Sequence, residues 1–262
     1  MNTVIVGGGV MGEAILGAAL ESGVFAATDV TVIEKLDMRR AQLQTSYGVT
    51  VTSEFAAMAE ADLVVLCVKP QEMKTVSGAL PPESLLLSIM AGVTIASLEA
   101  EFRHSRIVRA MPNTPAAVRA GISGWTATAG VSAEQRAFAQ SLLSAFGREL
   151  YFDDEKKLDM VTAVSGSGPA YVFLFIEALV EGAVAAGLQR AAAEELVLQT
   201  VYGSALYARE SGRSPAELRA MVTSPAGTTA AGLLELERGV FRASLIECVR
   251  AAHERAIELG KA

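Results

Sequence analysis

The sequence predicts an α/β fold in which a doubly wound sheet is followed by an all-helical domain. In the first part of the chain, short runs of valine, isoleucine and leucine alternate with helical patterns. A glycine-rich turn joins the first of these runs to the first helical pattern. After residue 152 the strand signal ends, and only helical patterns follow. We therefore expect one domain over residues 1–152 and a second over residues 153–262.

The first expected strand, residues 3–6, leads into a turn in which Gly7, Gly9 and Gly12 have G-x-G-x-x-G spacing. The first glycine of this pattern makes a tight turn, the second lets the backbone approach a pyrophosphate, and the third allows close helix–strand packing. The helix N-terminus then favours the negative phosphates. A glycine turn without a ligand is the alternative. We expect a Rossmann-type dinucleotide site formed by Gly7, Gly9, Val10, Met11 and Gly12.

Glu34 follows the second expected strand, residues 30–33, directly. A carboxylate about 20 residues beyond the glycines binds the ribose 2′-hydroxyl of NADH. The basic residues Lys35, Arg39 and Arg40 in the next turn can instead hold the 2′-phosphate of NADPH, or form a solvated helix face with neighbouring acids. These residues leave the cofactor open between NADH and NADPH.

Three later strands each end in a segment that can reach a bound cofactor. Ligands of open α/β sheets bind beyond the carboxyl ends of the strands, so we expect these segments over the cofactor, and the alternative for the first is a proline that only ends its strand. They are Lys69-Pro-Gln71 after the run 62–68, Met90-Ala-Gly92 after 85–89, and Met111-Pro-Asn-Thr-Pro115 after 107–110. Short strands at 49–52, 121–128 and 150–152, a helix ending at Met58 and a helix over 132–146 complete the expected first domain.

The second half is expected to form helices over residues 154–162, 168–186, 191–209, 215–221 and, in two parts, 228–259. Residues 165–169, Ser-Gly-Ser-Gly-Pro, are expected to form a flexible hinge or an ordinary loop before the second of these helices. The other unusual segment holds Ser224, Gly227, Thr228 and Thr229 around a helix N-terminus. Hydroxyls and free N–H groups together can bind a carboxylate, and a purely capping role is the alternative.

The longest apolar stretch, residues 170–188, has the composition of a membrane span but includes Glu177, Glu181 and Gly182. Each carboxylate costs about 2.5–3.5 kcal/mol near the centre of a bilayer. A helix that is apolar nearly all round is otherwise a buried one. We expect this helix in a domain core or a subunit interface and expect no membrane association.

Composition excludes several other classes of function. The net charge is −7, and the basic residues are scattered, which disfavours binding to nucleic acid. Hydrophobic residues make up 51% of the chain, a surplus that oligomerisation can bury. Cys67, Cys248, His104 and His253 are too dispersed for a metal site or a disulfide framework. Two unpaired thiols favour a reducing compartment, and the N-terminal residues lack the basic-then-apolar pattern of a signal peptide. We therefore expect a cytoplasmic protein.

Motifs along the whole chain resemble those of the pyrroline-5-carboxylate reductase family. They lie at residues 6–12, 68–71, 91–92, 109–115, 165–171 and 218–236, with Ser224-Pro-Ala-Gly-Thr-Thr229 as the most specific. The resemblance implies an oxidoreductase that transfers a hydride from NADPH or NADH to C5 of 1-pyrroline-5-carboxylate and forms L-proline, the last step of proline biosynthesis. It also implies that the helical domain dimerises and shares active sites across a homodimer or higher homo-oligomer.

Roles for individual residues follow from the same resemblance. Ser224, Gly227 and the backbone of Thr228 are expected to hold the substrate carboxylate, and the Thr229 hydroxyl to face the ring nitrogen as the catalytic group. An iminium carbon is already electrophilic, so positioning can supply most of the catalysis. The expected cofactor contacts beyond the glycine turn are Glu34, Val68, Lys69, Pro70, Ala91, Gly92 and Asn113.

One departure from the family concerns the loop after the third strand. Family members often have an asparagine there, near the adenine ribose, whereas this chain has Ser53-Glu-Phe55. Two other functions also fit a dinucleotide-binding domain followed by helices. A β-hydroxyacid-type dehydrogenase would need a lysine and an asparagine on the helix over 170–186, which has neither. A non-catalytic NAD(P)H sensor would have no use for the 224–229 segment.

Overall fold

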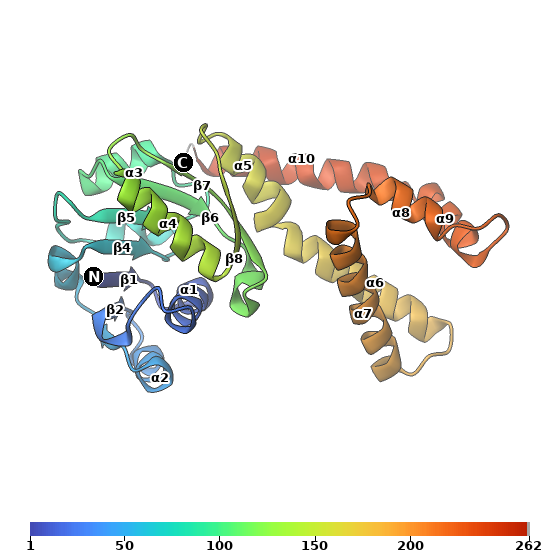
Figure 1. The fold of residues 1–262 in the computed structure, drawn as a ribbon, viewed down its shortest axis with the longest axis horizontal. Helices are drawn as coiled ribbons and strands as arrows, with labels where there is room; N and C mark the ends of the chain where they lie inside the picture. Colours follow the sequence, from blue (N-terminus) through green and yellow to red (C-terminus); the bar gives the residue numbers. More distant parts are fainter. Residues whose placement is uncertain (261–262) are drawn as a thin grey trace. The chain divides into compact units, whose positions relative to one another are not determined.

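The computed structural model describes residues 1–260 and divides into two compact units (Figure 1). The first comprises Met1–Pro169 together with the chain from Ala251 onward, and the second is Ala170–Arg250. The last strand ends at Tyr151, so the change from strands to helices falls beside the expected boundary at residue 152. The compact units divide later, because residues after 152 still pack on the sheet. A Cβ built on Gly124, for example, would lie 2.7 Å from a methyl of Val161.

The first unit contains the expected doubly wound sheet, with the order β3-β2-β1-β4-β5-β6-β7-β8. Strands β1 to β6 run parallel, β7 pairs antiparallel with β6, and β8 pairs parallel with β7. The strands are β1 (Thr3–Val6), β2 (Val30–Ile33), β3 (Thr50–Thr52), β4 (Leu63–Leu66), β5 (Leu85–Ser88), β6 (Ile107–Met111), β7 (Gly121–Ala127) and β8 (Gly147–Tyr151).

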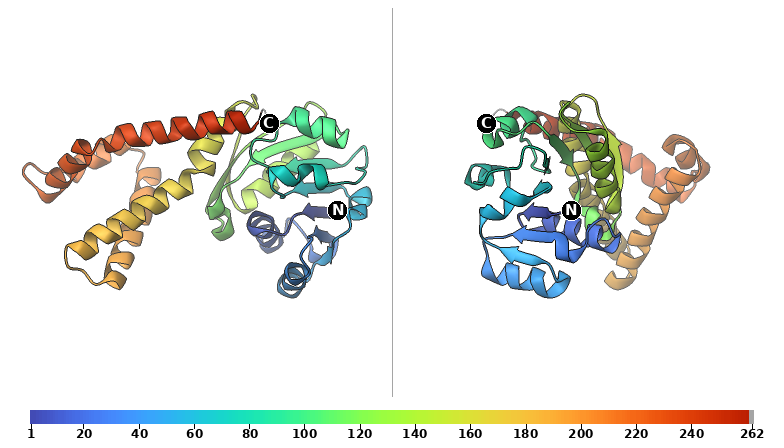
Figure 2. Two further views of the ribbon diagram at one scale, coloured as in Figure 1. Left: turned by 180° about the vertical axis from the view of Figure 1, so that it is seen from behind. Right: turned by 60° about the vertical axis from the view of Figure 1, so that its left-hand side comes forward.

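Both faces of this sheet are covered, as continuous apolar strands require. Successive residues of a strand point to opposite faces, so Ile5 joins one core with helices α1 (Val10–Glu21) and α4 (Ala133–Ala145). Val4 and Val6 join the other core with α3 (Ile95–Phe102). Figure 2 shows α3 and α4 on opposite sides of the sheet in its right-hand view. Helix α2 (Asp37–Tyr47) adds Leu43 to the core of Ile5.

Several connections of the first unit are 3-10 helices. The helix expected to end at Met58 is a 3-10 helix that continues to Glu60, and its Met58 is fully buried. Tighter turns suit short connectors between strands. These segments are η1 (Ala27–Asp29), η2 (Phe55–Glu60), η3 (Pro70–Thr75) and η4 (Thr114–Val118).

The expected hinge at residues 165–169 is also wrong as a description of this segment. Helix α5 (Lys157–Val161) passes into a π-helix, η5 (Thr162–Gly166), and then into α6 (Gly168–Ala185). Side-chain hydroxyls bond back to the preceding turn: Thr162 Oγ1 donates to the Leu158 carbonyl at 2.7 Å and Ser165 Oγ to the Val161 carbonyl at 3.0 Å. Helical backbone with such back-bonds replaces the loop that the glycines suggested.

The second unit is helical, with α6 and α7 (Arg190–Glu210) side by side in Figure 1. It also contains α8 (Pro215–Met221), α9 (Thr228–Arg238) and the first part of α10 (Phe241–Leu259). Its core consists of Val180, Ala193 and Val197. Ser214 begins α8 with a capping box to Glu217.

Helix α6 is not buried within its own chain. Phe173 is 60% exposed and Leu174 67% exposed, so the expectation of a domain-core helix is not met and the expected subunit interface remains. By length and composition alone, the helical stretch Lys157–Ala185 would also be able to cross a membrane, a test that core helices of soluble proteins pass as well.

Candidate active site

The glycine turn between β1 and α1 is fixed by close backbone contacts. Gly7 has φ +102°, and a Cβ built on it would lie 2.9 Å from the carbonyl carbon of Cys67. A Cβ on Gly12 would lie only 2.0 Å from the Gly7 carbonyl oxygen. A Cβ on Gly9 meets no other heavy atom of residues 1–260 within 4 Å, its chain neighbours aside. Gly7 and Gly12 therefore serve packing, whereas the space beside Gly9 is open to a ligand.

Gly9 is the N-cap of α1, and Val10 beside it is 71% exposed. The N–H groups of the first helical turn, from Val10 to Gly12, have no acceptor within the helix. Glycine has no side chain that could cap them. An anion placed at this turn would be held by these N–H groups and by the helix dipole.

Glu34 lies at the end of β2 and turns its carboxylate toward the glycine turn. The Gly8 N–H donates to Glu34 Oε2 at 3.0 Å, and the Leu36 N–H donates to Oε1 at 3.0 Å. These two bonds hold the carboxylate beside the turn and leave further lone pairs on both oxygens. A ribose hydroxyl is a suitable donor for them.

The basic residues beside Glu34 are already paired. The Arg39 guanidinium donates to the Gly8 carbonyl at 2.7 Å and contacts Glu13 at 2.5 Å. Arg40 donates to the Glu34 carbonyl oxygen at 2.6 Å. The Lys35 ammonium pairs with Glu72, and this hydrogen bond raises the pKa of Lys35 and lowers the pKa of Glu72. A 2′-phosphate would have to displace one of these partners.

The carboxyl ends of β1, β4, β5 and β6 meet at one edge of the sheet, which brings most of the expected cofactor residues together. Val68, Lys69 and Pro70 follow β4, and Ala91 and Gly92 follow β5. Gly92 has φ +75°, and a Cβ there would lie 2.9 Å from the Leu259 Cβ. Glycine at this position therefore allows the turn after β5 to pack closely against the end of α10.

Asn113 follows β6 at the same edge of the sheet. Its Oδ1 accepts the N–H of Ile122 at 2.9 Å, which ties the loop after β6 to the start of β7. This bond gives the Asn113 carbonyl group a structural role that its position in the sequence did not indicate. Its amide NH₂ group and a second lone pair on Oδ1 are left to meet a cofactor.

The expected substrate segment lies in the second unit, at the N-terminus of α9. Gly227 is the N-cap, and a Cβ on it would lie 2.3 Å from Ser224 Oγ, so glycine is needed for the serine hydroxyl to lie there. Ala226 has φ +58°, a left-handed conformation that is rare for residues other than glycine and is found at ligand sites. Ser224 and Thr228 are exposed, and Thr229 is half-buried.

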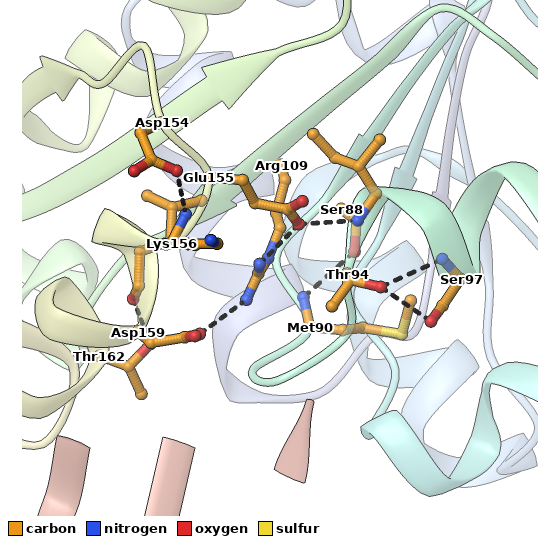
Figure 3. Close-up of polar contacts among 12 residues, drawn as sticks. Ser88, Met90, Thr94, Ser97, Arg109, Asp154, Glu155, Lys156, Asp159 and Thr162 are labelled. Atoms are coloured by element: carbon orange, nitrogen blue, oxygen red, sulfur yellow. Dashed lines mark hydrogen bonds and ion pairs between the residues drawn. The ribbon is translucent and has the colours of Figure 1, made fainter. Parts of the chain in front are cut away.

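The sequence did not single out one charged cluster of the first unit. Arg109 lies on β6 and is only 4% exposed, yet its guanidinium contacts Glu155 at 2.7 Å and Asp159 at 3.4 Å (Figure 3). The signal available was a single arginine inside the apolar run 107–110. A buried charge requires partners, and the sequence does not reveal where they are.

Two other chemistries receive no support from the geometry. Within residues 1–260 no group of three or more His, Cys, Asp or Glu side chains is arranged to hold a metal ion. Burial raises the pKa of the Cys67 thiol to about 12, so this thiol is not a nucleophile near neutral pH.

Known proteins match both units of the chain. Residues 155–259 match the family model described as pyrroline-5-carboxylate reductase dimerisation, and residues 2–92 match NADP oxidoreductase coenzyme F420-dependent. A pyrroline-5-carboxylate reductase of Synechocystis is 44% identical, over 98% of this chain and 97% of its own length. This chain belongs to the pyrroline-5-carboxylate reductase family.

Solved structures of the family agree with this assignment. A pyrroline-5-carboxylate reductase from Coxiella burnetii has a TM-score of 0.89 at 37% identity, covering 100% of this chain and 99% of its own. The Plasmodium falciparum pyrroline carboxylate reductase, solved with NADP bound, has a TM-score of 0.87 at 28% identity and covers 99% and 98%. The expected family and fold are confirmed. A member of the pyrroline-5-carboxylate reductase family reduces 1-pyrroline-5-carboxylate to L-proline with NAD(P)H, and these matches do not favour a β-hydroxyacid dehydrogenase or a sensor.

Proposed function

We propose that this reduction takes place where the glycine turn of one subunit meets the 224–229 segment of another. In this arrangement residues 1–152 form a dinucleotide-binding domain, and the rest of the chain forms a domain for dimerisation and substrate binding. The observation that carries the proposal is the full-length similarity to a family of known activity, which includes both segments. Each segment presents a helix N-terminus whose N-cap is a glycine.

The cofactor is proposed to lie along the carboxyl edge of the sheet. Its pyrophosphate contacts Gly9, Val10 and Met11, whose N–H groups are available for an anion. Gly7 and Gly12 shape the turn, and the Glu34 carboxylate faces the adenine ribose. The nicotinamide extends toward the segments after β4, β5 and β6, where the proposed contacts are Val68, Lys69, Pro70, Ala91, Gly92 and Asn113.

The substrate carboxylate is proposed to bind at the N-terminus of α9. The Ser224 hydroxyl and the Thr228 N–H donate to it, and Gly227 leaves the space for the serine side chain. The helix dipole adds a favourable field for the negative charge. This arrangement fixes the acid end of the ring and directs C5 toward the nicotinamide.

The reaction needs little acid–base chemistry from the protein. A hydride leaves C4 of the reduced nicotinamide with its electron pair and forms the new bond at C5, while the C=N π electrons move to the ring nitrogen. The proton on that nitrogen comes from an already protonated imine or from solvent. The Thr229 hydroxyl orients the nitrogen, because a threonine hydroxyl is too weak an acid to act as the main proton source.

The apolar face of α6 is proposed to be covered by a second copy of this chain in a homodimer or a larger homo-oligomer. The matched dimerisation region spans residues 155–259 and includes this helix, and Phe173 and Leu174 are exposed in the single chain. Glu177 and Glu181 argue against a lipid environment. The two free cysteines agree with a reducing compartment, and we propose the cytoplasm.

The direct test is to follow oxidation of NADH and NADPH by the purified protein on addition of 1-pyrroline-5-carboxylate, with L-proline identified as the product. We expect turnover with both cofactors, and the ratio of their kcat/KM values gives the cofactor preference. Binding of NAD(P)H without oxidation would instead favour a sensor. Oxidation of a β-hydroxyacid with NAD(P)⁺, without imine reduction, would favour the dehydrogenase.

A further inference from the structure

The Arg109 cluster connects three parts of the first unit that are distant in sequence, namely β6, the segment after β8 and the start of α3. Arg109 is in the middle of the sheet, and Glu155 and Asp159 belong to the segment that follows the last strand. Figure 3 shows the Glu155 carboxylate beside the Arg109 guanidinium, with Asp159 on the other side of it. Arg109 is 4% exposed, Glu155 29% and Asp159 20%, so the ion pairs are largely shielded from water.

Besides its contact with Arg109, Glu155 accepts a second hydrogen bond, which has no counterpart at Asp159 in the described part of the chain. The same oxygen, Oε1, accepts the backbone N–H of Ile95 at 2.7 Å. Ile95 is the first residue of α3, directly after the connection formed by residues 90–94. Thr94 caps this helix by accepting the Ser97 N–H at 3.1 Å. Glu155 therefore fixes the point at which the connection enters α3.

The other end of this connection is also held. The Met90 N–H donates to Ser88 Oγ at 3.3 Å, and Ser88 is fully buried on β5. Between these two anchors lie Ala91 and Gly92, the residues proposed to line the nicotinamide. Ser88 holds one end of the connection and the pair of Arg109 and Glu155 holds the other, while Gly92 between them packs against Leu259 of α10.

We propose that Glu155 is a positioning residue for hydride transfer. It holds the 90–94 connection against β6, so that Ala91 and Gly92 present one fixed surface to the nicotinamide. Arg109 orients the Glu155 carboxylate, and Asp159 supports Arg109. This inference rests on the proposed placement of the nicotinamide at Ala91 and Gly92. Loss of the link removes the anchor at the α3 end and allows the connection to shift there, and a misplacement of about 1 Å costs roughly 10²-fold in rate.

Two substitutions at Ile95 separate the effect of its N–H hydrogen bond to Glu155 from the effect of its side-chain packing. Ile95→Pro removes the N–H that Glu155 accepts, and proline is well tolerated as the first residue of a helix. Thr94, with φ −80° and ψ 158°, already has the extended conformation that a following proline requires. Ile95→Ala is the matched control, because it also loses the isoleucine side chain but keeps the N–H.

Substitutions at the carboxylates form a second, independent pair. Glu155→Ala removes the oxygen that accepts from both Arg109 and the Ile95 N–H. Asp159→Ala also removes a carboxylate from Arg109, yet Asp159 has no hydrogen bond to the connection among those found within residues 1–260. A purely structural role of the cluster predicts similar effects of Glu155→Ala and Asp159→Ala on activity.

The experiment measures kcat, the isotope effect with NAD(P)H deuterated at the transferred position, and the binding of ADP-ribose, which lacks the nicotinamide. For Ile95→Pro and Glu155→Ala we expect kcat to fall about 10- to 100-fold and the isotope effect to rise, with ADP-ribose binding within twofold of wild type. Ile95→Ala and Asp159→Ala should keep kcat within about threefold. Equal kcat values for Ile95→Pro and Ile95→Ala would overturn the proposal, as would a parallel loss of ADP-ribose binding.

A further variant, Ala91→Leu, separates this inference from the proposed cofactor site. A leucine there would occupy the space assigned to the nicotinamide, so kcat should fall while ADP-ribose still binds. If Ala91→Leu impairs turnover and Ile95→Pro does not, the positioning role of Glu155 is wrong and the cofactor site stands. If Ala91→Leu turns over like wild type, the placement of the nicotinamide is wrong, and the role proposed for Glu155 fails with it.

Discussion

At the scale of single residues, the Thr229 hydroxyl is the group whose removal should be most costly. Thr229→Ala should lower kcat by about 10²-fold or more, the usual effect of losing one positioned donor in an active site. Thr229→Ser retains the hydroxyl and should recover most of the activity. Steady-state kinetics at saturating NAD(P)H check this. Turnover of Thr229→Ala close to that of wild type would contradict a role at the ring nitrogen.

Glu34 should decide how far the enzyme prefers NADH over NADPH. Its carboxylate is held beside the glycine turn by the N–H groups of Gly8 and Leu36, where it would accept from a ribose hydroxyl and repel a 2′-phosphate. A hydrogen bond to a charged group contributes about 1.5–3 kcal/mol, so Glu34→Gln should shift the ratio of kcat/KM values toward NADPH by about tenfold or more. An unchanged ratio would show that the ribose lies elsewhere.

At the scale of elements, the turn between β1 and α1 allows stability and binding to be separated. Gly12→Ala places a methyl against the Gly7 carbonyl and should lower the free energy of unfolding by about 1–3 kcal/mol or more. Gly9→Ala places its methyl in open space and should leave the free energy of unfolding within about 0.5 kcal/mol of wild type. It should nonetheless weaken NAD(P)H binding, because the methyl lies where the pyrophosphate is proposed to bind. Urea unfolding and fluorescence titration measure the two effects.

Elements with a strong local pattern were predictable, whereas a helix that runs through glycines and a contact between distant residues were not. The run 3–6 is β-branched and ends in glycines, so the strand and the turn followed from local chemistry. The glycines and serines of 165–169 suggested a loop, but the chain continues from η5 into α6, with Thr162 and Ser165 bonding back to the preceding turn. The pair of Arg109 and Glu155 joins residues 46 positions apart, a contact that only the fold determines.

At the scale of the whole molecule, the exposed face of α6 predicts the oligomeric state. Leu174→Glu should dissociate the oligomer, because it places a charge in the apolar surface that a second subunit is proposed to cover. The matched control is Ser141→Glu, which adds the same charge to an exposed position of α4 and should leave the mass unchanged. Light scattering after gel filtration measures both. A Leu174→Glu protein of wild-type mass would place the subunit interface elsewhere.

Sharing of active sites between subunits can be tested by mixing two inactive variants. Gly9→Val should block cofactor binding and leave the 224–229 segment intact, whereas Thr229→Ala should do the reverse. If each site combines the glycine turn of one subunit with Thr229 of another, a mixed dimer contains one site in which both parts are intact. Random reassociation of equal amounts should then restore about a quarter of wild-type activity, since about half of the dimers are mixed and each has one working site of two. Sites contained within single subunits would give no recovery, because every subunit in the mixture carries one defect.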